Sequence, residues 1–237
     1  MNVTTLLILL LVGVLITFLS GNKIASRVAL LFSSVSFGLA LYLTKLFLNG
    51  NDVGFSALWL HNPQVFLAFK ADGLALAMVL LTTALTSIII FSSLETPSKK
   101  SNNLYALVLF MSFAMTGTFL ASDGLLYYIF WELALLPIYF IALIWGNGEA
   151  PSRQKAVVKF FVYTLAGSLF MLVGFGYLYS KANSFLWDDL CRLKLNYTEQ
   201  SWMFLAFFMA YAIKIPLVPF HTWQANVYQK APAIGTM

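Results

Sequence analysis

Two charged residues, Glu132 and Lys214, lie well inside long apolar stretches of the sequence, and a proline follows each of them within a few residues. The surrounding sequences are FWELALLPIYF from Phe130 and AIKIPLVPFHTW from Ala212. A charge at the depth of a lipid bilayer costs about 2.5–3.5 kcal/mol on insertion scales, so such residues usually mark an ion or proton path. These two residues are therefore the first candidates for function.

A carboxylate and an ammonium in apolar surroundings can control a proton if they meet. An isolated buried lysine gives up its proton easily, whereas a nearby carboxylate stabilises the protonated form. At 1.5 Å per helical residue, Glu132 is expected roughly 13 Å and Lys214 roughly 20 Å below one membrane surface, within a hydrocarbon core about 30 Å thick. Bringing the two together or separating them would switch a proton acceptor without redox chemistry. The alternative is a static ion pair that fixes helix packing.

Proline and histidine residues surround this pair. Pro216 and Pro219 closely follow the lysine, and each removes a backbone donor and kinks or breaks a helix. A broken helix at membrane depth is tolerated where it is buried in protein or lines a wet cavity, and such helices recur at transporter ion sites; the alternative is an ordinary proline kink. His221, with an unperturbed pKa of about 6.5, suits a proton relay, or else it caps a helix end. Pro137 is expected to loosen the helix that carries Glu132.

The composition identifies a polytopic membrane protein. The 237 residues are 60% hydrophobic and 10% charged, whereas a soluble domain averages about 25% charged residues. The net charge of +5 is attributed to membrane orientation, with the lipid bilayer and no nucleic acid as partner. The sequence has no Gly-rich phosphate loop and no His/Cys cluster with metal spacing. Cys191 is the only cysteine, so no internal disulfide forms.

The expected fold is all-α, a transmembrane helix bundle of about seven spans plus the start of an eighth at Ala233. The first span lacks the basic residues of a signal peptide and is predicted to be a retained helix. The connection 49–69 is predicted to form a small hairpin, and 181–200 to include a helix lying at the membrane interface. The predicted spans are 3–20, 29–48, 73–94, 104–121, 125–145, 157–179 and 201–220.

The distribution of Lys and Arg predicts an N-terminus outside the membrane. This orientation puts eight basic residues on the inner connections and five on the outer ones. Lys70 and Asp72 are expected to anchor the start of the third span, and Lys159 to extend its charge toward the membrane surface. His61 is expected to be solvated. The eight inner residues are Lys23, Arg27, Lys99, Lys100, Arg153, Lys155, Lys159 and Lys230.

Four stretches resemble the antiporter-like subunits of respiratory complex I, and most closely the subunit M group of bacterial NADH-quinone oxidoreductases. They are ADGLALAMVLLTTALT, FWELALLPIYFIALIWG, AVVKFFVYTLAGSLFMLVGF and AIKIPLVPFHTWQANVYQKAPAIGTM, which begin at residues 71, 130, 156 and 212. The resemblance implies that Glu132 and Lys214 form the proton-channel pair and that His221 lies at a broken seventh helix. Family members commonly have a Leu-Pro-Asp-Ala-His run after HTW, but this sequence has QANVYQ, so no role of that acid or that second His carries over.

The same resemblance implies about fourteen spans with two inverted repeats, so the sequence is expected to be C-terminally truncated. Residues 1–237 would form one membrane domain, with three spans in 1–103 and an incomplete first antiporter-like repeat in 104–237. The implied function is proton translocation in the bacterial inner membrane beside other membrane-arm subunits. NADH, FMN, iron–sulfur clusters and quinone would bind to partner subunits. The alternatives are a subunit of a multi-subunit Na+/H+ antiporter or membrane-bound hydrogenase, and a structural assembly subunit.

Overall fold

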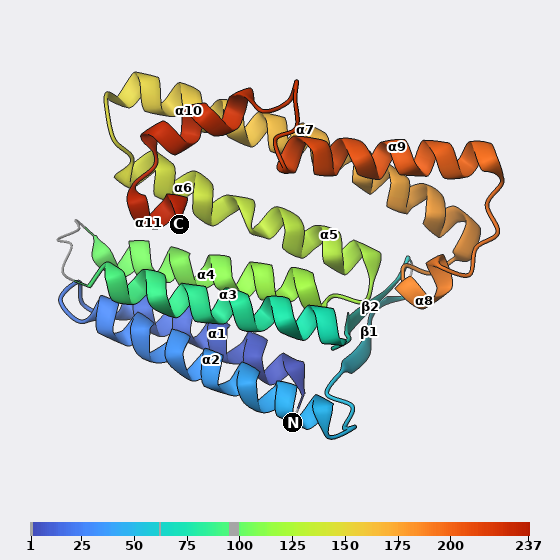
Figure 1. Ribbon diagram of the computed structural model, residues 1–237, viewed down its shortest axis with the longest axis horizontal. Coiled ribbons are helices and arrows are strands. Elements are labelled where there is room, and N and C mark those ends of the chain that lie inside the picture. The colour runs from blue at the N-terminus through green and yellow to red at the C-terminus, as the bar shows by residue number, and fades with distance from the viewer. Residues whose placement is uncertain (1, 62, 95–99) are drawn as a thin grey trace.

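The computed structural model describes residues 2–61, 63–94 and 100–237, and in this part the chain is mostly helical (Figure 1). Lys99, which the orientation prediction counted, lies outside the described residues. The elements are α1 (Val3–Leu19), α2 (Ala25–Leu48), β1 (Phe55–His61), β2 (Gln64–Phe69), α3 (Gly73–Ser92), α4 (Ser101–Leu120), α5 (Gly124–Leu133), α6 (Leu135–Trp145), α7 (Ala150–Ala182), α8 (Trp187–Leu190), α9 (Tyr197–Lys214), α10 (Thr222–Lys230) and α11 (Ala233–Thr236).

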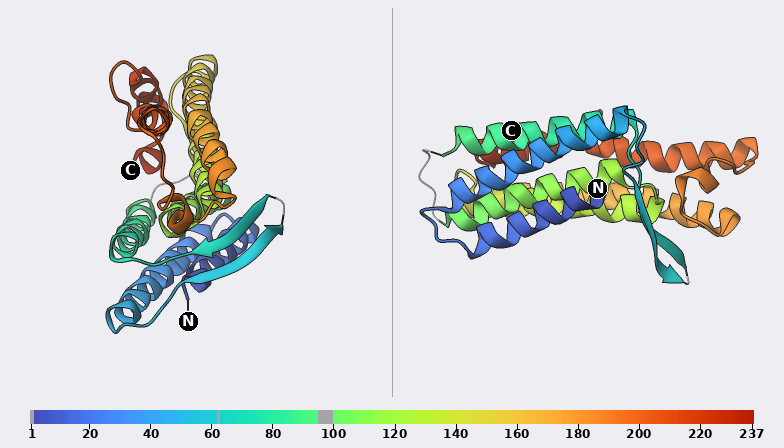
Figure 2. Two further views of the ribbon diagram at one scale, coloured as in Figure 1. Left: turned by 90° about the vertical axis from the view of Figure 1, so that its right-hand side faces the viewer. Right: turned by 90° about the horizontal axis from the view of Figure 1, so that it is seen from below.

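The first four helices form a bundle. Helix α1 packs against α2 and α4, and α3 packs against the same two helices (Figures 1 and 2). Leu6, Leu10 and Leu43 are fully buried in its core. Asp72 caps the start of α3 by accepting a hydrogen bond of 2.7 Å from the N–H of Ala75, which confirms its predicted anchoring role.

A β-hairpin lies at one end of this bundle (Figure 1). Strands β1 and β2 are antiparallel, with Phe55 opposite Phe69 and a bulge between Leu58 and Leu60. This confirms the predicted hairpin, whose alternating apolar residues pair as strands, within a chain that is mostly helical as expected. The predicted interfacial helix is reduced to the single turn of α8.

Buried Asp123 ties the hairpin to the start of α5. One carboxylate oxygen accepts hydrogen bonds from the N–H groups of Leu125 (3.0 Å) and Leu126 (3.1 Å), and the other accepts from the N–H of Phe66 in β2 (3.1 Å). The indole of Trp187 donates to the carbonyl of Ala121 in the same region at 3.1 Å. Burial raises the pKa of Asp123, although these N–H groups oppose the rise. The first turn of α5 is therefore fixed before the chain reaches Glu132.

The second half of the chain packs α5, α6, α9 and α10 around the long helix α7. Helices α7 and α9 lie side by side and extend beyond the first bundle (Figures 1 and 2). The fifth predicted span divides into α5 and α6 only at Ala134, whose backbone angles stay helical, whereas the seventh ends as a helix at Lys214. The predicted break after Lys214 is thereby confirmed.

Five helical segments of the described chain are long and apolar enough to cross a membrane, and the shorter apolar helix α1 adds to them. The protein is therefore a multi-pass membrane protein. The expected number of seven spans is not confirmed, because α1 has only 17 residues and α9 includes a polar first turn. The five segments are Ala25–Leu48, Gly73–Ser92, Ser101–Leu120, Gly124–Trp145 and Ala150–Ala182.

Candidate functional site

Glu132 lies one residue before the end of α5, at the interruption between α5 and α6. Pro137 has no N–H to donate to the carbonyl of Leu133, and its ring crowds that carbonyl, so the helix ends where the pattern predicted it would loosen. The Glu132 side chain is half-buried. Its Oε1 atom is fully covered and has no hydrogen-bond partner among the described residues. A buried oxygen without a partner is costly, so this atom is available to a cation or a proton.

Lys214 is the last residue of α9 and precedes the second interruption. Pro216 has no N–H for the carbonyl of Ala212, and the N–H of Leu217 takes its place at 2.8 Å. The next carbonyl, that of Ile213, accepts a hydrogen bond of 2.9 Å from the indole of Trp223. The HTW sequence thus supplies a donor to the helix end that carries Lys214.

The structure brings the two charged side chains into electrostatic range, but it does not join them as an ion pair. The carboxylate of Glu132 and the ammonium of Lys214 attract each other electrostatically. Within the described ranges, however, no nitrogen–oxygen pair of Lys214 and Glu132 lies within 4.0 Å, and the ion pairs found are Lys70–Asp188 (3.5 Å) and Lys181–Glu199 (3.0 Å). The Nζ of Lys214 lies instead over the ring of Trp131, 5.2 Å from its centroid.

Aromatic side chains connect α5 to α9 beside the pair. The hydroxyl groups of Tyr127 and Tyr211 are 3.2 Å apart. The rings of Trp131 and Tyr211 meet edge to face at 5.5 Å and 80°. Tyr127, Trp131 and Tyr211 were not among the functional residues predicted from the sequence. Their spacing contained the signal, because Tyr127 is one helical turn before Trp131, and Tyr211 is one turn before Lys214.

Helix α7 contributes Ser168, which also was not predicted. This buried serine lies close enough to the Glu132 carboxyl to interact with it. Its hydroxyl donates a hydrogen bond to the carbonyl of Leu165 at 2.9 Å. The preceding residue, Gly167, allows α9 to approach closely, because a Cβ atom there would lie 2.9 Å from the Cδ1 of Ile213. The site is therefore assembled from α5, α7 and α9.

The other predicted residues lie apart from this cluster. His221 is exposed at the N-cap position of α10, and its side chain makes no capping hydrogen bond. Lys159 places its Nζ 5.6 Å from the centroid of the Tyr163 ring. His61 is exposed in β1. In the described residues, no group of three or more His, Cys, Asp or Glu side chains is arranged to hold a metal.

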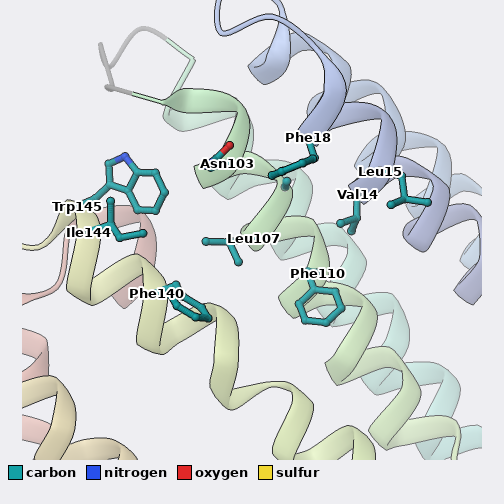
Figure 3. A pocket seen from close by; sticks show the side chains of 10 residues that line it. Val14, Leu15, Phe18, Asn103, Leu107, Phe110, Phe140, Ile144 and Trp145 are labelled. Atoms are coloured by element: carbon teal, nitrogen blue, oxygen red, sulfur yellow. The ribbon is translucent and has the colours of Figure 1, made fainter.

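An apolar cleft of about 380 Å³ lies between α1, α4 and α6, away from the charged residues (Figure 3). Phe18, Phe110, Phe140 and Trp145 are among its lining residues, and Asn103 adds one polar side chain. Neither Glu132 nor Lys214 lines it. The residues that line this cleft include no titratable group for proton chemistry.

Comparison with known proteins gives consistent matches. Residues 121–237 match the family described as NADH:quinone oxidoreductase/Mrp antiporter, TM. The chain is 34% identical to NADH-quinone oxidoreductase subunit M of Rickettsia prowazekii (strain Madrid E), in an alignment covering 100% of this chain and 49% of that protein. It therefore spans about half the length of the curated relatives that it matches.

Solved structures show the same similarity. A chain of respiratory complex I from Thermus thermophilus superposes with a TM-score of 0.83 and 30% identity, covering 95% of this chain and 46% of the other. A chain of the Mrp complex from Dietzia sp. DQ12-45-1b gives a TM-score of 0.87 and 19% identity, covering 98% of this chain and 26% of the other. At that identity the second match shows a shared fold alone.

Proposed function

We propose that the chain translocates protons as part of a membrane subunit of an NADH:quinone oxidoreductase, because residues 121–237 match the NADH:quinone oxidoreductase/Mrp antiporter transmembrane family and the whole chain is similar to subunit M of such an enzyme. The observation that supports this most is the position of two opposite charges at two helix interruptions. Glu132 precedes the α5–α6 interruption, and Lys214 ends α9. Interrupted helices provide backbone groups and space for ions at membrane depth, which continuous helices do not.

In this proposal Glu132 and Lys214 carry the proton step. An ammonium close to the carboxylate keeps its proton, and an ammonium withdrawn into apolar surroundings releases it. Changes in the distance between the two groups therefore load and unload Lys214 without electron transfer in this chain. The covered Oε1 of Glu132 supports this role, because it leaves an acceptor free for the ammonium. Exposed His221, beyond the break, is proposed as the relay that exchanges protons with water.

The surrounding complex is part of the same proposal. Other membrane-arm subunits would flank this chain in a bacterial inner membrane, with its N-terminus outside. NADH oxidation, FMN and iron–sulfur clusters would belong to partner subunits, and quinone would bind elsewhere in the membrane arm. Energy would reach Lys214 as a conformational or electrostatic bias on its distance from Glu132.

The test is Lys214→Met in the complete subunit, within its intact complex in sealed vesicles. Methionine keeps most of the side-chain length and removes the charge. NADH-driven proton uptake is expected to fall by about tenfold or more, since a positioned proton-transfer group typically contributes about 10²–10⁴-fold. Quinone reduction should fall with it if the two are tightly coupled. The matched control is Lys194→Met, an exposed lysine outside the helices, which should pump normally.

Assembly of the Lys214→Met complex is checked first by its subunit content. Normal assembly with unchanged pumping would remove Lys214 from the proton path and leave a structural ion-pair role. Loss of assembly without a change in transport per assembled complex would point to the structural role as well.

A second candidate is a subunit of a cation/proton antiporter that runs on ion gradients. The description of the family that residues 121–237 match favours it, because that description covers the Mrp antiporter as well as the oxidoreductase. Transport in vesicles energised by a sodium gradient, with no NADH, separates the two candidates. Proton movement that follows the sodium gradient would favour the antiporter, and movement that requires NADH would favour the oxidoreductase.

A further inference from the structure

The ammonium of Lys214 rests on an aromatic ring although a carboxylate is available nearby. Its Nζ is 5.2 Å from the centroid of Trp131, within the distance of about 6 Å at which a cation is attracted by the face of an indole. Trp131 immediately precedes Glu132 in α5. One lysine therefore has two adjacent stabilising groups, the indole face and the carboxylate.

The indole is fixed by its neighbours. The ring of Tyr211 packs against it edge to face at 5.5 Å, and the ring of Tyr127 lies at 5.7 Å. The hydroxyl groups of these two tyrosines, 3.2 Å apart, join α5 to α9. Because Tyr211 lies one turn before Lys214 on α9, the contacts that hold the ring also hold the helix end that carries the ammonium.

The Glu132 carboxylate lies near the Lys214 ammonium but does not form an ion pair with it. Oε1 of Glu132 is fully covered and without a hydrogen-bond partner in the described part of the chain. The residues after Lys214 form no α-helix until Thr222. Lys214 is the last residue of α9, so no following helical turn packs beside its side chain. The ammonium therefore has an aromatic partner in contact and a carboxylate, on the residue next to that partner, that it does not contact.

We propose that Trp131 is a positioning residue that offers the Lys214 ammonium a second binding place, so that the charge alternates between the indole face and the Glu132 carboxylate. This inference rests on the proposed proton-translocating function and names the group that stabilises the separated state of the pair. Without the indole the ammonium would lose the aromatic face over which it now lies, 5.2 Å from the ring centroid. Weakening the ring therefore lowers the population of the separated state.

The test replaces Trp131 by tryptophans with one to four ring fluorines, introduced at that position alone in the complete subunit in its complex. Each fluorine withdraws electrons from the ring face and weakens its attraction for a cation, with little change in size. NADH-driven proton uptake is expected to fall stepwise along the series, by about twofold to thirtyfold in total, which is the measured range of such interactions expressed as an equilibrium ratio. Proton uptake in Trp131→Phe should fall by an amount within this range. Uptake in Trp131→Leu, which has no aromatic ring, should fall by about thirtyfold or more.

The control is the same series at Trp202, which is 64% exposed on α9 and should show no trend. Uptake that does not respond to fluorine at Trp131 would overturn the proposal and leave the indole a packing role. If Lys214→Met pumps normally, the proposed function fails; if it does not pump but the fluorine series is flat, only the role of Trp131 fails. A ¹⁹F resonance at position 131 that shifts on Lys214→Met supports the contact independently of transport, and an unchanged resonance contradicts it.

Discussion

Replacing Trp223 by phenylalanine removes one hydrogen bond from the helix break and leaves most of the packing in place. The indole N–H donates to the carbonyl of Ile213 at 2.9 Å, and Trp223 is only 5% exposed. A phenyl ring keeps the contact with Phe160, whose ring lies 5.1 Å from the indole. The carbonyl next to Lys214 then has lost its buried donor, which costs about 1–3 kcal/mol.

This cost is measurable by thermal unfolding of the purified protein in detergent, followed by far-ultraviolet circular dichroism. For a chain of this size, each kcal/mol shifts Tm by about 2–4 °C, so Trp223→Phe should unfold about 2–12 °C below the wild type. The control Trp202→Phe changes an exposed side chain and should alter the free energy of unfolding by less than about 0.5 kcal/mol. Equal Tm values for the two variants would show that the indole does not stabilise the break.

Two further predictions concern the packing and the charges of α9. Gly167→Ala in α7 should lower the free energy of unfolding by about 1–3 kcal/mol and slow proton uptake, because the added Cβ would lie 2.9 Å from Ile213 of α9. The control is Gly176→Ala, also in α7, whose added Cβ would meet nothing within 4 Å. It should leave the free energy of unfolding unchanged or raise it by up to about 1 kcal/mol. Glu199, in the first turn of α9, has its pKa lowered from 4.5 to about 2 by hydrogen bonds, first from the Tyr177 hydroxyl, and by Lys181. Its contribution to stability is therefore complete above pH 4.5 and lost as the pH falls toward 2. The protection of the amides in that turn, relative to their intrinsic exchange rate at each pH, should fall over this interval in the wild type, and an equal fall in Glu199→Gln would contradict the assignment.

Several elements were predictable because their signals are local. The apolar segments, the buried charges and the prolines can all be read along one stretch of chain. Pro137 and Pro216 interrupt their helices by removing an N–H donor, which requires no knowledge of the rest of the fold. Asp72 similarly caps α3 within four residues of chain. The limits of helices were less predictable: α7 runs from Ala150 to Ala182, well beyond the apolar segment 157–179, because polar residues at a helix end continue the backbone hydrogen bonds.

The sequence by itself determined that this is a multi-pass membrane protein with a carboxylate and an ammonium placed beside two proline breaks. It did not determine how those two charges are positioned, because the direction in which each helix presents its side chains depends on packing against other helices. Only the tertiary structure decided that the Lys214 ammonium lies over the ring of Trp131 and that the Trp223 indole donates a hydrogen bond to the carbonyl of Ile213 at the end of α9. Both contacts join separate elements, and an indole lies within reach of either group only after α5, α9 and α10 have packed around α7.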